Sequence, residues 1–313
     1  MKILFAGSPA IAVPSLEALS KIKGVELSGV LTNPDTPKGR HGTPQPTDVG
    51  EAALRLGITV LKPPKLDSSV REIVSALKPD LLVSFAYGRI FGPKFLSLFP
   101  LGGINIHPSL LPKYRGPTPI QAAILNRDKV TGITIQRLAQ EMDSGDILAA
   151  EQLQLTGNET TGSLSDVVSV KAALMLPSVI DGVSAGVKGT VQDHSKASFC
   201  PLISKDDGLI DWNKKAVEIE AKIRAFDPWP LSRTIHNGRE LFILKAAIFN
   251  GDEPSNGEKL SGKVLNIDKQ NGILIQTGDG ILAVKQLQYQ AKKALFWKDF
   301  INGTRDFAGS ILG

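Results

Sequence analysis

Two short segments hold side chains that could stabilise a negative charge and move a proton. In Asn105-Ile106-His107 the amide and the imidazole are two residues apart, so both would point to the same face of a β-strand. An amide donor and a protonated imidazole on one face suit the stabilisation of an oxyanion. Further along, residues 140–147 form a turn rich in acids between two β-rich stretches, and a carboxylate there could accept a proton. Each segment by itself is more often an ordinary polar pair or a surface turn.

The elements that must position these residues alternate between strands and helices. Short apolar runs predict strands at residues 2–6, 25–31, 80–85 and 103–106. Helical spacing predicts helices at residues 13–22, 48–56, 70–77 and 119–125, and later stretches predict β-structure at 132–138 and 148–155 and a long helix at 161–180. This order predicts an α/β fold with a mostly parallel, doubly wound, Rossmann-like sheet. The first turn, Gly7-Ser8-Pro9-Ala10-Ile11-Ala12, lacks the later glycines of a dinucleotide site, so NAD binding is not expected.

The remainder of the chain predicts a second, smaller domain. Periodicity fades over residues 188–207, which we interpret as a linker between a catalytic domain at 1–187 and a C-terminal domain at 208–313. One helix is expected at 214–226, and the predicted strands are 232–235, 240–249, 262–268, 272–277 and 280–287. Short strands separated by Asn-Gly and Asp-Gly turns predict a small antiparallel barrel of the oligonucleotide-binding type.

Composition limits the classes of protein without choosing one. Lys and Arg outnumber Asp and Glu by 36 to 31, a net charge of +5 that permits a polyanionic partner but does not require one. The start has too short an apolar run for a signal peptide, and no stretch is expected to reach a membrane span, so the sequence predicts a soluble, cytoplasmic protein. Cys200 is the only cysteine and the four histidines are scattered, so no metal site is expected.

Taken together, the motifs resemble those of the 10-formyltetrahydrofolate-dependent formyltransferases. The resemblance rests on Asn105-x-His107 followed by Ser109-Leu110-Leu111-Pro112, and on Met142-Asp143-Ser144-Gly145-Asp146-Ile147. The family's catalytic Asn, His and Asp would correspond to Asn105, His107 and Asp143. Asp146 is a neighbour and does not match the family's catalytic carboxylate.

Within that family, the chain is most similar to the branch that acts on methionyl-tRNA. The matching segments are Phe5-Ala6-Gly7-Ser8-Pro9, Asn33-Pro34-Asp35, Ala86-Tyr87-Gly88, Ile210-Asp211-Trp212 and Ile223-Arg224-Ala225-Phe226-Asp227-Pro228-Trp229-Pro230. Pro108 departs from the glycine that many members of this branch carry, and proline there is usual in sister branches. The short glycinamide ribonucleotide branch ends near residue 200, whereas this chain continues to residue 313.

The resemblance implies a reaction and two sets of binding residues. A formyl group would pass from 10-formyltetrahydrofolate to the α-amino group of initiator methionyl-tRNA, by attack of the neutral amine on the formyl carbon. Asn105 and a protonated His107 would donate to the oxyanion, and Asp143 would accept the proton of the amine. The implied folate contacts are Phe85, Ala86, Tyr87, Gly88, Ile90, Ser109, Leu110, Leu111 and Pro112. The apolar residues at 85–90 would form a wall for the flat pteridine, although plain core packing is an alternative for each.

The tRNA contacts implied by the resemblance lie in both domains. The long segment 33–47, rich in proline, carries Lys38, Arg40 and His41 and would enter the acceptor end of the tRNA; a merely mobile loop is the alternative. Lys292 and Lys293 of the second domain would meet tRNA phosphates. We expect a monomer that binds tRNA and folate and no membrane.

Two other functions are consistent with parts of the sequence. A formyltransferase acting on an amino-sugar nucleotide or another small amine shares the catalytic motifs and also has an additional domain. A non-catalytic RNA-binding protein built on the small barrel is the alternative of another class. It is weakened by the catalytic motifs and by the few aromatic residues in the predicted barrel strands.

Overall fold

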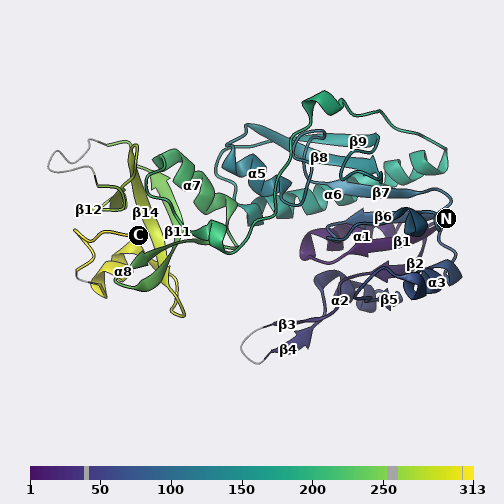
Figure 1. The fold of residues 1–313 in the computed structure, drawn as a ribbon, viewed down its shortest axis with the longest axis horizontal. Helices are drawn as coiled ribbons and strands as arrows, with labels where there is room; N and C mark the ends of the chain where they lie inside the picture. The colour runs from purple at the N-terminus through teal and green to yellow at the C-terminus, as the bar shows by residue number, and fades with distance from the viewer. Residues whose placement is uncertain (39–41, 252–259, 305) are drawn as a thin grey trace. The chain divides into compact units, whose positions relative to one another are not determined.

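The computed structural model of the chain describes residues 1–38, 42–251, 260–304 and 306–313, which fold as two compact units (Figure 1). The first unit consists of Met1–Pro119, Val130–Gln154 and Leu164–Pro201, and the second of Ile120–Lys129, Leu155–Ser163 and Leu202–Gly313. This division differs from the domains that we expected in two places. Two short segments before residue 187 group with the second unit. Residues 188–201 of the expected linker belong to the first.

A seven-stranded sheet forms the centre of the first unit, in the order β5-β2-β1-β6-β7-β8-β9. Its strands are β1 (Lys2–Gly7), β2 (Glu26–Leu31), β5 (Val60–Leu61), β6 (Leu81–Phe85), β7 (Gly103–His107), β8 (Val130–Arg137) and β9 (Ile147–Gln154). The first five strands pair in parallel, whereas β8 and β9 run antiparallel to their neighbours. The expectation of a mostly parallel sheet is therefore confirmed.

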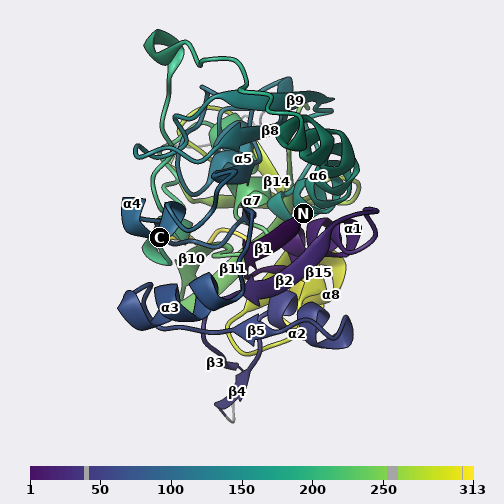
Figure 2. The same ribbon diagram turned by 90° about the vertical axis from the view of Figure 1, so that its right-hand side faces the viewer.

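Helices cover both faces of this sheet. Those of the first unit are α1 (Val13–Leu19), α2 (Asp48–Arg55), α3 (Ser68–Ala76), α4 (Pro93–Leu96) and most of α6 (Thr161–Ser184), with single turns η1 (Ala10–Ala12) and η2 (His194–Lys196). Figure 2 shows α1 and α6 on one face and α3 and α4 on the other. On the latter face Leu4 and Ala6 of β1 pack with Val74 of α3 and Phe95 of α4. Burial of the larger of these side chains, Leu4, Val74 and Phe95, stabilises the packed layers by about 1.5 to 3 kcal/mol each.

The helix α6 corrects one expectation from the sequence. By length and composition alone it could cross a membrane, with a mean hydropathy of 1.5. Its buried side chains include Leu164, Val168, Ala172, Leu176 and Ile180, which recur every four residues along one stripe. A helix that packs one such stripe inside a protein passes the same test of length and composition, so this finding is weak evidence for a span.

The segment 33–47, expected to be an irregular loop, contains a short β-hairpin. Strands β3 (Thr36–Lys38) and β4 (Thr43–Gln45) pair antiparallel, and the hairpin projects from the first unit in both views (Figures 1 and 2). Its base is tied down by an ion pair of 2.6 Å between Asp35 and Lys62. Arg40 and His41 lie outside the described residues, as does the side chain of Lys38.

The second unit contains an antiparallel sheet in the order β10-β11-β14-β13-β12, with β15 beside β14. The strands are β10 (Ser232–His236), β11 (Arg239–Ile248), β12 (Val264–Asp268), β13 (Gly272–Gln276), β14 (Ile281–Tyr289) and β15 (Leu295–Phe296), and the helices and turns are α5 (Pro119–Leu125), η3 (Asp206–Gly208), α7 (Ala216–Ala225) and α8 (Trp297–Asn302). The expected small antiparallel domain is confirmed.

The last residues of the chain link the two edges of this sheet. Leu312 donates its backbone N–H to the carbonyl of Gly262, just before β12, and Gly313 donates to Ile235 in β10. The described strands pair as an open path, so these tail contacts, rather than a strand pairing, bring β10 and β12 together. The core beneath includes Trp212, Ile219 of α7, Leu241, Ile273 and Phe300.

Candidate active site

The three residues singled out in the sequence meet in the first unit. Asn105 and His107 lie on one face of β7, where they pair with Gln136 and Thr134 of β8. Asp143 lies in the connection from β8 to β9, and this connection brings its carboxylate next to Asn105 and His107. Its Oδ1 is 3.3 Å from Asn105 Nδ2, and its Oδ2 is 3.5 Å from His107 Nδ1. The expectation that these three side chains lie together is therefore met by the geometry.

The carboxylate of Asp143 is surrounded by hydrogen-bond donors. Oδ1 accepts from Asn105 Nδ2 and from Gln136 Nε2 at 2.9 Å, and Oδ2 accepts from the backbone N–H of Gly116 at 2.9 Å. Because an ionised carboxylate only accepts, both amides must turn their nitrogen atoms toward it. This orientation leaves the second N–H of Asn105, which is only half-buried, available to a substrate oxygen.

His107 is 4% exposed, and both its ring nitrogens face protein groups. Nε2 is 2.8 Å from the carbonyl oxygen of Tyr114, which can only accept, so Nε2 carries a proton in every state. The pKa of His107 is lowered, because burial penalises the charged ring more than Asp143 and the Tyr114 carbonyl favour it. This differs from the expectation of a protonated His107 that donates to an oxyanion.

The turn that carries Asp143 has an unusual backbone conformation and packs closely against β8. Asp143 has φ = +52°, in the left-handed region that residues other than glycine rarely adopt. Two residues later, a Cβ atom on Gly145 would clash with the carbonyl oxygen of Arg137, so only glycine fits there. Sequence reasoning located this turn but not its strain.

Several contributors to the site were missed by sequence reasoning. Gln136 had a readable signal, since Thr134-Ile135-Gln136 places two polar side chains on one face of the strand. The backbone contributions of Tyr114 and Gly116 had none. Gln192, which donates to the Asp143 turn, stands in the segment that we expected to be a linker.

The structure places the expected folate contacts in two environments. Phe85 and Tyr87 are 1% and 2% exposed, so their side chains belong to the core and do not form the expected apolar wall. Ala86, Gly88 and Ile90 are exposed, and the first two have positive φ. The physical reason is that successive residues after β6 face opposite sides of the chain. Phe85 and Tyr87 therefore point into the core, and Ala86 points to solvent.

The second folate segment, residues 109–112, is fixed against β8. Ser109 Oγ donates to the carbonyl of Lys113, and Thr134 Oγ1 donates to the carbonyl of Ser109 at 2.7 Å. The backbone N–H of Leu111 donates back to Thr134 Oγ1 at 3.1 Å. Ser109 and Leu111 are buried, whereas Leu110 and Pro112 are half-buried.

One amide connects three of the motifs that carry the family resemblance. Asn33 Nδ2 donates to Ser8 Oγ at 2.9 Å and to the carbonyl oxygen of Tyr87 at 3.0 Å. It therefore joins the segments that follow β1, β2 and β6, which are neighbours in the sheet.

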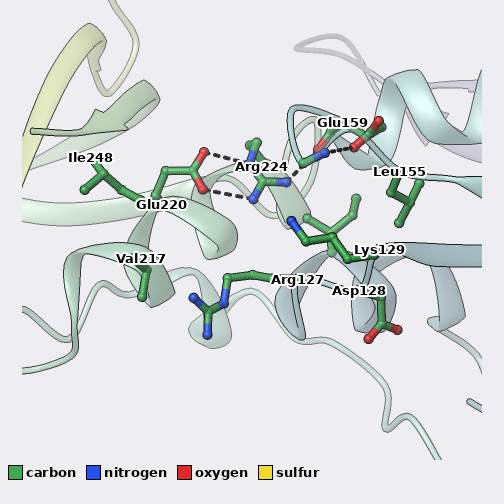
Figure 3. A pocket seen from close by; sticks show the side chains of 11 residues that line it. Arg127, Asp128, Lys129, Leu155, Glu159, Val217, Glu220, Arg224 and Ile248 are labelled. Carbon is green, nitrogen blue, oxygen red and sulfur yellow. Dashed lines mark hydrogen bonds and ion pairs between the residues drawn. The ribbon is translucent and has the colours of Figure 1, made fainter. Parts of the chain in front are cut away.

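Of the expected tRNA contacts, Lys292 and Lys293 are described, and both are exposed in the turn between β14 and β15 of the second unit. That unit also contains a pocket of about 170 Å³, shown in Figure 3. Its lining mixes three basic residues with three acidic ones, and Arg224 is paired with Glu220 at 2.6 Å. This balance does not indicate an anion site. Within the described ranges, no three His, Cys, Asp or Glu side chains are grouped as metal ligands.

Comparison with known proteins matches both parts of the chain. A model of the formyl transferase family matches residues 1–180, and a model of the formyl transferase C-terminal domain matches residues 202–305. The methionyl-tRNA formyltransferase of Treponema denticola is 49% identical over 98% of this chain and 98% of its own length. The protein of the same name from Treponema pallidum is 45% identical over 97% of each.

A solved structure shares the fold over most of the chain. The N-formyltransferase from Helicobacter canadensis, in complex with folinic acid and dTDP-3-aminofucose, has a TM-score of 0.65 and 22% identity. It covers 91% of this chain and 99% of its own. At this level of identity the likeness concerns the fold alone. The family models and the relatives that match along the whole length show that this chain belongs to the formyl transferase family, in the group of the methionyl-tRNA formyltransferases.

Proposed function

We propose that the protein transfers a formyl group from 10-formyltetrahydrofolate to the α-amino group of methionyl initiator tRNA. The observation that carries this proposal is the cluster of Asn105, His107 and Asp143 in a chain that resembles enzymes of this name along nearly its whole length. The products are N-formylmethionyl-tRNA for translation initiation and tetrahydrofolate. The proposed setting is the cytoplasm, with the protein as a monomer.

The proposed chemistry needs no covalent enzyme intermediate. An α-amino group with a pKa near 8 is partly neutral at pH 7 and attacks the formyl carbon directly. The free N–H of Asn105 donates to the oxyanion that forms, a contribution of roughly 3 to 4 kcal/mol for such a donor. The bond from carbon to the folate nitrogen then breaks, and that nitrogen takes up a proton.

Asp143 is the proposed acceptor of the amine proton, directly or through one water molecule. His107 has its pKa lowered by burial, so we assign it as a neutral ring that borders Asp143. When the amine proton reaches this pair, Nδ1 of His107 is a second base within 3.5 Å of the carboxylate. This role differs from that of an oxyanion donor, because in the described geometry neither nitrogen is free to reach a substrate oxygen.

The folate is proposed to contact exposed backbone more than apolar side chains. Ala86 and Gly88 supply exposed main chain after β6, and Ile90 supplies an apolar side chain that is 77% exposed. Residues 109–112 supply a second, rigid segment. Main-chain groups with fixed positions suit the many hydrogen-bonding atoms of a pteridine.

We assign tRNA binding to Lys292 and Lys293 of the second unit and to Lys38, Arg40 and His41 of the segment 33–47. From Asp206 onward the chain has 15 basic and 14 acidic residues, so bulk charge offers little attraction there. Binding to tRNA must then depend on the positions of individual lysines relative to the tRNA phosphates. The amino-sugar nucleotide alternative has the support of a shared fold only.

A test offers the protein 10-formyltetrahydrofolate together with one acceptor at a time. The acceptors are methionyl initiator tRNA, methionyl elongator tRNA, free methionine and an amino-sugar nucleotide. We expect rapid transfer to the initiator tRNA and at least about 100-fold slower transfer to the small amines, because remote contacts with tRNA contribute to the transition state. Preferential transfer to a small amine would contradict the proposal.

A further inference from the structure

The side chain of Gln192 is bonded on every polar atom, although it stands in a stretch of the sequence without periodicity. It is 3% exposed, and its Nε2 lies 2.7 Å from the carbonyl oxygen of Gly145 and 3.0 Å from that of Asp143. A third acceptor, Gln136 Oε1, is 3.2 Å away. An amide nitrogen has two hydrogens, so the two nearer carbonyls of the turn take them in ordinary bonds.

Arg115 determines which way the Gln192 amide points. Its Nη2 and Nε donate to Gln192 Oε1 at 2.7 and 3.3 Å. Because a guanidinium group has no acceptor, the oxygen of Gln192 must face Arg115 and the nitrogen must face the turn. The orientation of the Gln192 amide is therefore set by chemistry and not by packing alone.

Arg115 is itself held in a fixed place. It is 4% exposed, and its backbone bonds to Ser198 and Cys200 on the same segment as Gln192. Its Nη2 also lies 3.0 Å from His194 Nδ1, and none of its described interactions is with a carboxylate. The next residue, Gly116, donates to the Asp143 side chain. Gly116 thus holds the side chain of Asp143 directly. Arg115 holds the backbone of Asp143 indirectly, through Gln192.

The backbone of Asp143 needs such support. Its left-handed φ of +52° costs about 1 kcal/mol or more for a residue other than glycine, and it persists only where neighbours enforce it. Nε2 of Gln192 bonds the carbonyls on both sides of Ser144, that is, of the residue with this φ and of Gly145. Loss of these bonds would let the turn relax and carry the carboxylate away from Asn105 and His107.

We propose that Gln192, oriented by Arg115, is a positioning residue that holds the Asp143 turn in register with Asn105 and His107. The inference rests on the formyl transfer proposed above and adds a residue to its machinery. Gln192 acts through Asp143, since its polar atoms are all engaged with the protein. If the role of Gln192 were purely structural, its substitution would lower the stability of the protein, and its effect on the transfer rate would be the same with and without Asp143.

The test compares Gln192→Met with the double variant Q192M/R115M, each with and without D143A. Methionine has the length of glutamine without its polar ends, and removal of Arg115 in the double variant avoids an unpaired buried cation. Gln276→Met is the matched control. Gln276 is equally buried and donates to two turn carbonyls, those of Thr277 and Gly280, in the second unit.

We expect Q192M and Q192M/R115M to lower single-turnover transfer about 10- to 100-fold, the scale of a small misplacement of a catalytic group. KM for tRNA should change less than about threefold. In the D143A background either change should lower the single-turnover rate less than about threefold, because the carboxylate that Gln192 positions is gone. Q276M should lower the thermal midpoint and leave transfer unchanged. An equal loss with and without Asp143, or a loss below threefold, would overturn the proposal.

A second measurement does not depend on activity. In NMR titrations, Q192M/R115M and D143N should both move the pKa of His107 further down, because Asp143 raises it in the native protein. A His107 titration that is unchanged in Q192M/R115M would overturn the positioning role. Absence of transfer in the unaltered protein would overturn the proposed function alone, and the titration would still decide the role of Gln192.

Discussion

The candidate active site and the turn with Lys292 and Lys293 hold their charged groups in opposite ways. Asp143 accepts from three donors, and the residues around it are bonded in turn. Lys292 and Lys293 are exposed, and neither has an ion-pair partner among the described residues. In the active site, polar side chains lose contact with water and gain hydrogen bonds that fix their positions. In the basic turn, the two ammonium groups stay exposed to water.

The difference follows from what each region is proposed to do. Catalysis rewards groups that are already in place when charge develops, since they need not reorganise during the reaction. Attraction of a polyanion depends mainly on charge, is screened by salt and tolerates flexible side chains. Substitutions in the first region should therefore change rates, and those in the second should change binding and its response to salt.

The largest effects are expected from Asn105→Ala and Asp143→Ala. Each should lower the single-turnover rate by about two orders of magnitude or more, through the loss of an oxyanion donor or of a proton acceptor. The matched control is Asp146→Ala, which removes a carboxylate three residues away and should leave the rate within about threefold. Circular dichroism checks the fold, and near-normal turnover in either catalytic variant would contradict the assigned role of that residue.

The dependence of the rate on pH should distinguish a neutral from a protonated His107. Its pKa is lowered by burial, so the neutral ring predominates near pH 7. If the neutral ring suffices, the single-turnover rate should rise about tenfold per pH unit below the amine pKa near 8. If a protonated ring is required, the rising fraction of neutral amine and the falling fraction of charged ring cancel. The rate would then be flat between the two pKa values, and our assignment of His107 would be wrong.

A smaller effect is expected in the basic turn. Replacing Lys292 and Lys293 by Gln should weaken tRNA binding and reduce the slope of log K against log salt by roughly 0.7 to 0.9 for each phosphate that the protein no longer neutralises. The turnover of bound tRNA should be unchanged. As a control, Lys21→Gln with Lys23→Gln removes two lysines of the first unit and the same net charge. Equal weakening by both pairs would show that total charge, not position, matters.

The smallest effect concerns stability in acid. His107 has a folded-state pKa below its unfolded value of 6.5, so the unfolded chain binds the proton more readily. This residue therefore favours the folded state above pH 6.5, and that contribution is lost as the pH falls toward the folded pKa. His107→Asn should make the thermal midpoint fall less steeply from pH 7 to pH 5. An unchanged slope would assign acid sensitivity elsewhere, for example to His236, whose pKa is also lowered by burial.

Much of the fold could be predicted from the sequence because its signals are local. The apolar runs at 80–85 and 103–106 and the period of residues 161–180 depend only on nearby side chains, and each appears as an element close to the expected bounds. The face shared by Asn105 and His107 followed from the period of a strand. Burial was harder to predict, as Phe85 and Tyr87 show: an apolar residue suits a core as well as a ligand wall.

The two-part architecture and the antiparallel second domain could be predicted from the sequence, because strand and helix periods act over short stretches. Motif spacing in turn nominated the three residues of the candidate site. The bonds that hold Asp143 and the burial that lowers the pKa of His107 arise from the tertiary structure. The bonds of Gln192 join residues 47 to 77 positions apart, and its neighbours in the sequence give no sign of them. The lowered pKa of His107 arises from burial by segments that converge from several parts of the chain. Such bonds and such burial exist only once distant segments have packed together.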